Sequence, residues 1–172
     1  MVLAVSDSDV LIHLAKLDLL YLLKDQFAKI YTSEIIYNEC VVQGISLQKT
    51  DAILLKDFFQ SEFIIKKKVN IKDINKIKDK YNIHEGESSI IALAKIFNVD
   101  LFLTNEIKVR NIAKSEGFSV SGTLGIILRG FTLGSIEKDH ALRILKDIQE
   151  KIDEFRFHPK LIEIVLNKLE KM

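Results

Sequence analysis

The stretch Val2-Leu-Ala-Val-Ser-Asp7 decides the fold class, because it is an apolar run without polar alternation that ends on an acidic residue. Strands covered on both faces have this continuous apolar character, and they occur in parallel sheets. The stretch Asp100–Thr104 repeats the pattern and leads into Asn105 and Glu106. We therefore expect two buried parallel strands whose ends deliver polar and acidic side chains to one edge of a sheet.

Outward from these two runs, further strands alternate with amphipathic helices. The other strands are expected at Lys29–Thr32, Phe63–Ile65 and Phe118–Ser121. Helices are expected at 10–27 (one kinked or two short), Glu34–Val42 with Gly44 as its stop, Leu47–Phe59, Glu85–Phe97, Glu106–Glu116, 123–131, 136–154 and 160–171. This order predicts an α/β protein with three α/β/α layers, a central, mostly parallel sheet and a helical C-terminal segment. We expect a single domain over 1–172, with an α/β core at 1–135 and C-terminal helices at 136–172.

Composition narrows the class of protein. With 48% apolar and 28% charged residues the chain is globular rather than disordered. The net charge is only +1, so a surface for nucleic acid must be a local patch. The single Cys40 excludes an intramolecular disulfide and an all-cysteine zinc site. No apolar run approaches the roughly 20 residues that span a bilayer, and no signal peptide is apparent, so we expect a cytoplasmic protein with no membrane partner.

Two glutamates stand on apolar helix faces. Glu39 follows Ile35 by four residues and precedes Val42 by three, so the three side chains share one face. Glu87 shares a face with Ile90 and Ile91 in the same way. An unpaired buried carboxylate costs several kcal/mol or becomes protonated. A divalent cation is the simplest common partner for two such groups.

Each acidic residue also has a purely structural explanation. Asp7 begins a segment that suits a helix N-cap. Glu87 and Glu106 lie in first helical turns, where the helix dipole favours negative charge. Glu39 lies in mid-helix and has the weakest structural explanation.

In chain order, these residues resemble the successive motifs of PIN domains. The four motifs are Val5-Ser-Asp7-Ser-Asp-Val-Leu-Ile-His-Leu14, Ile36-Tyr-Asn-Glu39, Glu85-Gly-Glu87-Ser-Ser-Ile-Ile-Ala-Leu-Ala94 and Leu101-Phe-Leu-Thr-Asn-Glu106-Ile-Lys-Val-Arg110. The tail segments Gly122-Thr-Leu-Gly-Ile-Ile and Phe155-Arg-Phe-His-Pro-Lys-Leu look like a prokaryotic PIN-like subfamily.

The resemblance implies a PIN-like fold and a metal-dependent nuclease, usually directed at RNA and often the toxin of a VapC-type toxin–antitoxin pair. Carried over by position, the catalytic and metal-binding acids are Asp7, Glu39, Glu87 and Glu106. Ser8 falls on a small hydroxyl that supports the first acid, and Thr104 and Asn105 fall on the polar lead-in to the last. PIN domains usually place aspartate where this chain has Asn105 and Glu106, so we expect Glu106 to be the fourth acid and Asn105 to be secondary.

Oxygen ligands without histidine or thiolate suit Mg²⁺ or Mn²⁺, which can activate a water for attack on phosphorus. The substrate phosphates then need cations, and Lys108 and Arg110 lie close after Glu106; they could equally form solvent-facing pairs. The lysine-rich stretch Lys66–Lys80 is either an RNA track or a solvated face.

Three other functions compete with an active nuclease. The first is a PIN-like scaffold with weakened catalysis that binds RNA or a protein. The second is a phosphatase of the haloacid-dehalogenase type that uses Asp7 and Asp9, although no acidic pair follows the strand at Phe118–Ser121. The third is a receiver-like signalling module, which would not need Glu39 or Glu87.

The expected partners are RNA, an antitoxin protein and a second copy of the chain. The homodimer is inferred from the C-terminal helices, which carry more apolar side chains than a terminal helix pair easily covers. These side chains are Ile144, Ile148, Ile152, Phe155, Leu161, Val165 and Leu169.

Overall fold

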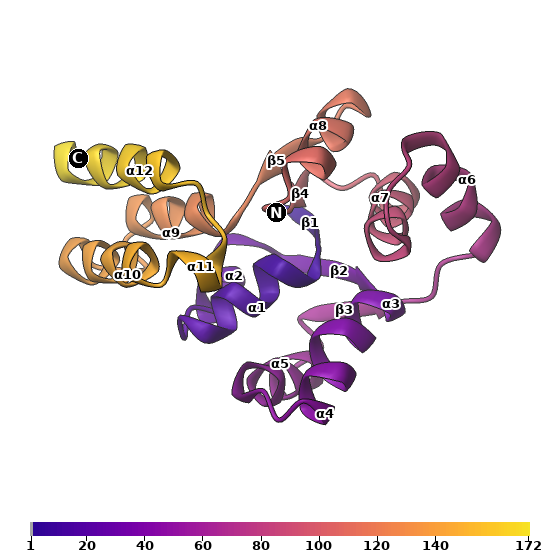
Figure 1. Cartoon of the computed structure of the whole chain (residues 1–172), viewed down its shortest axis with the longest axis horizontal. Coiled ribbons are helices and arrows are strands. Elements are labelled where there is room, and N and C mark those ends of the chain that lie inside the picture. Colours follow the sequence, from indigo (N-terminus) through magenta and orange to yellow (C-terminus); the bar gives the residue numbers. More distant parts are fainter. Residues whose placement is uncertain (1) are drawn as a thin grey trace. The chain divides into compact units, whose positions relative to one another are not determined.

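The computed structural model describes residues 2–172 and shows alternating strands and helices (Figure 1). The strands in this range are β1 (Leu3–Ser6), β2 (Lys29–Ser33), β3 (Ile64–Lys67), β4 (Leu101–Leu103) and β5 (Ser119–Ser121). The helices up to β4 are α1 (Ser8–Lys16), α2 (Tyr21–Gln26), α3 (Glu34–Tyr37), the π-helical segment η1 (Asn38–Gln43), α4 (Gly44–Ser46), α5 (Thr50–Gln60), α6 (Ile71–Tyr81) and α7 (Glu85–Phe97). They are followed by α8 (Ile107–Ser115), α9 (Thr123–Thr132), α10 (Lys138–Glu150), α11 (Ile152–Phe155) and α12 (Pro159–Lys171).

The five strands form one sheet in the order β3-β2-β1-β4-β5, and every neighbouring pair is parallel. Because crossover connections are right-handed, β1, β2 and β3 place their connecting helices on one face, whereas the return to β4 and β5 places α7 and α8 on the other. Figure 1 shows this arrangement, with α1, α2 and α5 on the opposite side of the sheet from α7 and α8. The predicted α/β fold with a parallel sheet flanked by helices is confirmed.

The chain order of the sheet reverses between β1 and β4, which is where ligands bind in open α/β sheets. The Asp7 N–H donates to the Leu103 carbonyl at 3.1 Å, and the Thr104 N–H donates to the Ser121 carbonyl at 2.9 Å. The parallel ladder therefore continues one residue past β1 and β4. Asp7 and Thr104 consequently lie side by side at the carboxyl edge of the sheet.

Helix α1 stops at Lys16, and Asp18 adopts a left-handed φ of 56° before α2 begins. The expected segment 10–27 is thus two short helices, which was one of the two forms predicted.

The helical segment from Glu34 does not stop at Gly44, contrary to the sequence prediction. Gly44 has a helical φ of −58° and ψ of −43°, and helix continues to Ser46. A Cβ on Gly44 would lie 2.6 Å from the Cβ of Ala52, so glycine here allows α5 to approach closely. Its role is in packing rather than in helix termination.

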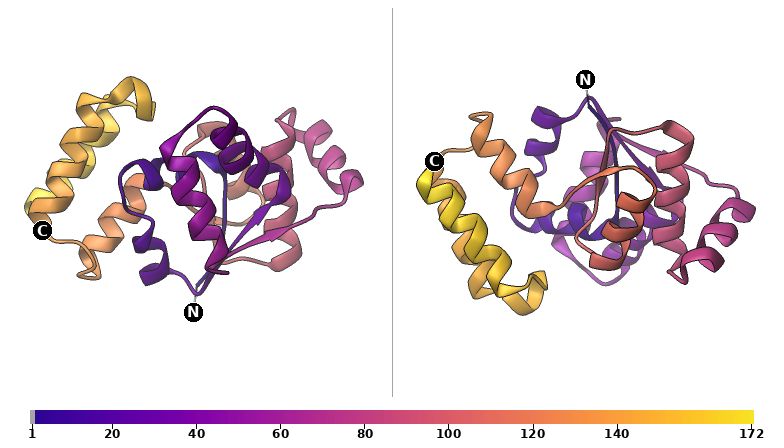
Figure 2. Two further views of the ribbon diagram at one scale, coloured as in Figure 1. Left: turned by 90° about the horizontal axis from the view of Figure 1, so that it is seen from below. Right: turned by 90° about the horizontal axis from the view of Figure 1, so that it is seen from above.

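The lysine-rich stretch after β3 forms α6, which packs against α7 and lies on the outer side of it in both views of Figure 2. Asn70 caps this helix by accepting a hydrogen bond from the Lys72 N–H at 2.9 Å. Glu116, which follows α8, forms salt bridges with Lys80 of α6 at 3.0 Å and with Lys95 of α7 at 2.5 Å.

The chain divides into two compact units, one ending at Thr123 and the other spanning Leu124–Met172. The boundary follows Thr123, the first residue of α9, and the predicted division into a core at 1–135 and C-terminal helices at 136–172 stays a prediction. Within the second unit α10 packs against α12. Among residues 2–172, no helix combines the length and apolar character needed to cross a bilayer.

Candidate metal centre

Asp7 is the buried acid at the carboxyl edge of the sheet. It is the N-cap of α1, and its Oδ1 accepts a hydrogen bond from the Val10 N–H at 3.0 Å. The pKa of Asp7 is raised from 3.8 to about 7, mainly by burial; hydrogen bonds from Thr104 and Val10 oppose the shift, and the negative charges of Asp9 and Glu87 add to it. The fold therefore keeps a carboxylate where its charge is poorly solvated.

Thr104 and Arg110 connect Asp7 to the end of β4. The buried Thr104 hydroxyl donates to the Asp7 carboxylate and accepts from the Glu106 N–H at 3.2 Å. Arg110 donates from Nη1 to the Thr104 carbonyl at 2.8 Å. Partial burial lowers the pKa of Arg110, and the Asp7 charge opposes that shift, so the guanidinium lies within electrostatic reach of Asp7.

Glu39 reaches the site from η1 and is half-buried. The Ser8 hydroxyl donates to its Oε2 at 3.2 Å. Burial raises the pKa of Glu39; the Ser8 hydrogen bond opposes this, and the charges of Asp9 and Glu87 add to it. Ser8 was predicted to support the first acid, but in the structure it holds Glu39.

Gly86 leaves room for the Glu39 carboxylate at the N-terminus of α7. A Cβ on Gly86 would lie 2.7 Å from the Glu39 Oε1 and 3.2 Å from the Ile36 side chain. The absence of a side chain thus lets the carboxylate approach the positive end of the helix dipole. Gly86 lies within the third PIN-like motif, but the motif by itself does not indicate this packing role.

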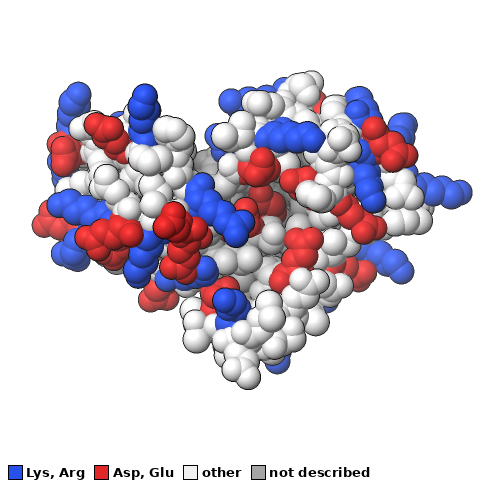
Figure 3. Space-filling model, viewed as in Figure 1, with Lys and Arg blue, Asp and Glu red and all other residues white. Residues whose placement is uncertain are grey.

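Glu87, in the first turn of α7, is the third acid of the cluster. Its Oε2 accepts a hydrogen bond from the His84 N–H at 2.8 Å, so it also forms part of the helix cap. Its charge acts on both Asp7 and Glu39, which places the three acids in one electrostatic group. Figure 3 shows acidic side chains in the central part of the view, where β1 and β4 lie in Figure 1.

The donor set of this cluster fits a hard divalent cation, because Asp7, Glu39 and Glu87 offer only carboxylate oxygens. Within residues 2–172, no three acidic, histidine or cysteine side chains lie close enough to share one ion. Each of the three carboxylates is turned toward a hydrogen-bond donor of the protein. The chemistry of the donors therefore fits Mg²⁺ or Mn²⁺, whereas the positions of these carboxylates in the structure do not bring three of them around one ion.

Glu106 lies at the same end of the sheet but is exposed. It is the N-cap of α8, and its Oε1 accepts from the Lys108 N–H at 3.4 Å. Glu106 thus caps α8 from the position before its first turn, whereas the sequence indicated a place within that turn. The place of Glu106 as a fourth metal ligand stays a prediction.

The Asn105 side chain contacts Thr123 and His13, and we call this group of contacts the Asn105 clamp; the sequence did not predict it. Its Oδ1 accepts from the Thr123 N–H at 3.0 Å, and its Nδ2 donates to the Thr123 hydroxyl at 3.0 Å and lies 3.2 Å from His13 Nδ1. A Cβ on Gly122 would lie 2.5 Å from the Asn105 Oδ1. The dipeptide Gly122-Thr123 was visible as a family-like tail motif, and this contact gives it a physical reason.

The two cations expected to bind phosphate differ in environment. Lys108 is exposed and donates from Nζ to the Asn82 carbonyl at 2.5 Å. Arg110 is half-buried beside Thr104 and Asp7. Of the two, Arg110 is the one close to the acidic cluster.

Comparison with known proteins agrees with the fold described above. A family model described as a PIN domain matches residues 3–171, which is nearly the whole chain. A search of curated proteins gave no match. The family resemblance predicted from the four sequence motifs is confirmed, and it favours the nuclease class over the phosphatase and the receiver module.

Proposed function

Because the chain belongs to the PIN-domain family, we propose that it is a Mg²⁺- or Mn²⁺-dependent endoribonuclease that hydrolyses RNA phosphodiester bonds. PIN domains are generally nucleases that bind Mg²⁺, and the finer assignment to RNA cleavage is our inference. The observation that carries it is Asp7, a buried carboxylate whose pKa is raised to about 7 by burial and by neighbouring acids. Such a group is costly for folding and is typical of functional sites.

The proposed site uses Asp7, Glu39 and Glu87 to hold the ion, with Glu106 as a fourth acid. When bound, the ion supplies a water of lowered pKa and neutralises charge on the phosphate. Neutralisation by a cation would also lower the pKa of Asp7, so that the carboxylate is ionised at neutral pH.

The remaining residues of the site position these groups. Thr104 fixes the Asp7 carboxylate and Ser8 fixes Glu39. Arg110 is held by the Thr104 carbonyl and can place its guanidinium against a non-bridging phosphate oxygen. Lys108 is proposed as a second phosphate contact on the exposed side.

A catalytically weakened scaffold is the second candidate, and specific observations favour it. Asn105 replaces a usual aspartate and is fully engaged with Thr123 and His13, while Glu106 caps α8. If these two positions contribute nothing to metal binding, the site has three acids.

Cleavage of single-stranded RNA tests the proposal. The wild-type protein should cleave with Mg²⁺ or Mn²⁺, stop with chelator, and lose most activity in Asp7→Asn, whereas Asp57→Asn on the exposed side of α5 should cleave normally. Glu106→Gln should weaken cleavage strongly if Glu106 is the fourth acid. Chelator-resistant cleavage, or equal activity in Asp7→Asn, would refute a metal-dependent site built on Asp7.

Manganese binding separates the two candidates. Isothermal titration of Mn²⁺ should show a site in the wild-type protein that is lost in Asp7→Asn. A protein that binds no Mn²⁺ and cleaves no RNA is the scaffold.

The toxin role, an antitoxin partner and a cytoplasmic location belong to the same proposal, and their support is the family resemblance. Growth arrest on expression of the wild-type chain, relieved in Asp7→Asn, would support the toxin role. A homodimer is also proposed, although Ile144, Ile148 and Leu169 are buried and α10 packs against α12 in the same unit. Light scattering that gives a monomer at high micromolar concentration would refute it.

A further inference from the structure

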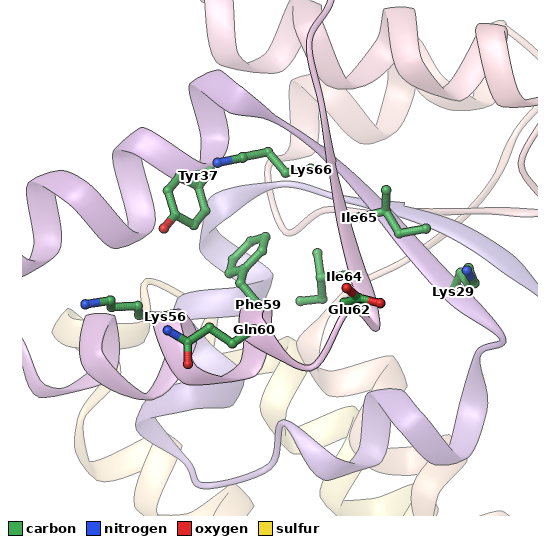
Figure 4. Close-up of a pocket in the computed structure, with 9 residues that line it drawn as sticks. All are labelled: Lys29, Tyr37, Lys56, Phe59, Gln60, Glu62, Ile64, Ile65 and Lys66. Carbon is green, nitrogen blue, oxygen red and sulfur yellow. The ribbon is translucent and has the colours of Figure 1, made fainter.

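A cavity of about 470 Å³ lies against the edge strand β3 and is lined from β2, α3, α5 and β3 (Figure 4). Its wall carries two aromatic rings, Tyr37 and Phe59, and three lysines, Lys29, Lys56 and Lys66, with Glu62 as the one acidic residue among those that line it. The acidic cluster around Asp7 contributes none of these residues.

The aromatic wall is ordered and accessible. The rings of Tyr37 and Phe59 meet edge to face with centroids 4.9 Å apart. Both side chains are half-buried, so each is fixed by packing and still presents surface to the cavity. Figure 4 shows the two rings beside each other, with the Lys66 side chain reaching over Tyr37. A planar apolar ligand such as a nucleobase stacks favourably on a surface of this kind.

The three lysines give the cavity an excess of positive charge. Lys66 holds its ammonium 4.0 Å from the Tyr37 ring centroid. In the described part of the chain, none of the three lysines pairs with a carboxylate within 4.0 Å. With only Glu62 to oppose three cations, the cavity favours an anion. The lysine-rich stretch that begins at Lys66 was predicted to be either an RNA track or a solvated face, and this residue faces an aromatic cavity.

The cavity is also linked to the acidic cluster through one helical segment. Tyr37 ends α3, and Glu39 follows two residues later in η1. Residues two apart in a helical segment point to nearly opposite sides of the axis. Tyr37 accordingly faces α5 and β3, whereas Glu39 faces Ser8 and Gly86.

We propose that this cavity binds one nucleotide of the single-stranded RNA, with the base against Tyr37 and Phe59 and the adjoining phosphates against Lys56 and Lys66. The inference rests on the proposed ribonuclease function, because it assigns a nucleotide remote from the bond that is cleaved. The cavity then contributes affinity and substrate length preference, and the cluster around Asp7 contributes chemistry.

Binding is measured with a fluorescein-labelled 12-nucleotide RNA and the Asp7→Asn protein in chelator, so that cleavage cannot interfere. Each phosphate contact on a single strand contributes about −0.7 to the slope of log K against log salt. Lys56→Ala with Lys66→Ala should therefore make the slope shallower by about 1.4. Lys68→Ala, which removes an exposed lysine that does not line the cavity, is the matched control and should have a clearly smaller effect.

The aromatic contribution is tested with Phe59→Leu, which keeps an apolar side chain and removes the stacking face. Affinity should fall roughly five- to 100-fold. Circular dichroism confirms that the variant is folded; if it is not, ultraviolet cross-linking of the RNA to the parent Asp7→Asn protein carries the test, and mass spectrometry should find the cross-link on Tyr37 or Phe59. Cross-links confined to other segments, with a salt slope unchanged in the double lysine variant, would overturn the proposal.

Two further outcomes are distinguishable. If a decaglutamate peptide displaces the RNA as well as unlabelled RNA does, the cavity accepts any polyanion and the nucleotide assignment is wrong. If the lysine and Phe59 variants weaken RNA binding while the wild-type protein cleaves nothing with Mg²⁺ or Mn²⁺, the cavity stands and the nuclease proposal fails. In an active enzyme, the same variants in the wild-type background should raise KM for the 12-nucleotide RNA and leave kcat unchanged.

Discussion

The Asp7→Asn substitution should stabilise the metal-free protein at alkaline pH. In the unfolded chain Asp7 has its usual pKa of 3.8, and in the folded chain the pKa is about 7. Between these two values the folded state holds a proton that the unfolded state has released, so the free energy of unfolding falls as pH rises. At about 1.4 kcal/mol per pH unit, the ionised side chain costs the folded state about 4 kcal/mol above pH 7.

Asparagine removes this cost with little change in local structure. It is an N-cap as favourable as aspartate, so its side chain can accept the Val10 N–H as Asp7 does. The Thr104 hydroxyl can donate or accept and can therefore turn toward the new amide. We expect Asp7→Asn to exceed the wild-type free energy of unfolding by about 4 kcal/mol at pH 8 in chelator and by little at pH 4.

The measurement is urea denaturation at pH 4, 6 and 8, followed by circular dichroism. Cys40 is the only cysteine and is buried in the unit that contains Asp7, so its reaction with a thiol reagent reports the unfolding of that unit. Asp57→Asn, at an exposed position of α5, is the matched control and should not show the pH-dependent gain. Equal stabilities of Asp7→Asn and wild type at pH 8 would show that the Asp7 carboxylate is well solvated, and the argument for a costly functional acid would fail. With millimolar Mn²⁺ the difference should shrink, because ion binding stabilises only the wild-type fold.

Three further predictions follow from the contacts around the site. Gly86→Ala introduces a Cβ 2.7 Å from the Glu39 Oε1, so metal-dependent cleavage should fall at least tenfold while circular dichroism still shows a folded chain; unchanged activity would mean that Glu39 is free to move or is not used. Asn105→Asp loses the amide donor to Thr123, so thermal denaturation should show a loss of about 1–2 kcal/mol rather than a more active enzyme, and a gain in activity without loss of stability would contradict the clamp. Hydrogen bonds and ion pairs from two lysines and Tyr81 lower the pKa of Glu116 from 4.5 to about 2, so Glu116→Gln should melt earlier than wild type at pH 7, and the difference should vanish as pH falls toward 2; a difference that persists at pH 2 would exclude charge as its cause.

Local sequence predicted the elements well where one physical signal dominates. The apolar runs that end at Ser6 and Leu103 form parallel strands, and Glu85–Phe97 is helical over the range that its periodicity predicted. Gly44 was misjudged because a glycine after a helical pattern usually ends the helix, whereas here the contact with Ala52 requires a residue without a side chain. That contact joins residues of two different helices and is not encoded in the local pattern.

The sequence likewise predicted only part of the candidate site. The sequence identified Asp7 as an acid at the end of an apolar strand and Glu39 as an acid on an apolar helix face, because strand ends and helix periodicity can be read from the order of residue types. The order of motifs also identified the family. What the sequence could not supply is the orientation of polar groups: Ser8 turns to Glu39 rather than to the first acid, and Asn105 closes on Thr123.

The cavity beside β3 was beyond sequence analysis altogether. Tyr37, Phe59 and Lys66 lie on three elements, and only the parallel pairing of β2 with β3 and the packing of α5 bring their side chains together. The sequence by itself determined which residues are acidic, apolar or helical, since these properties depend on residue type and short-range spacing. The tertiary structure alone decided which of those residues meet, because hydrogen-bond partners and cavity walls depend on directions and distances between segments far apart in the chain.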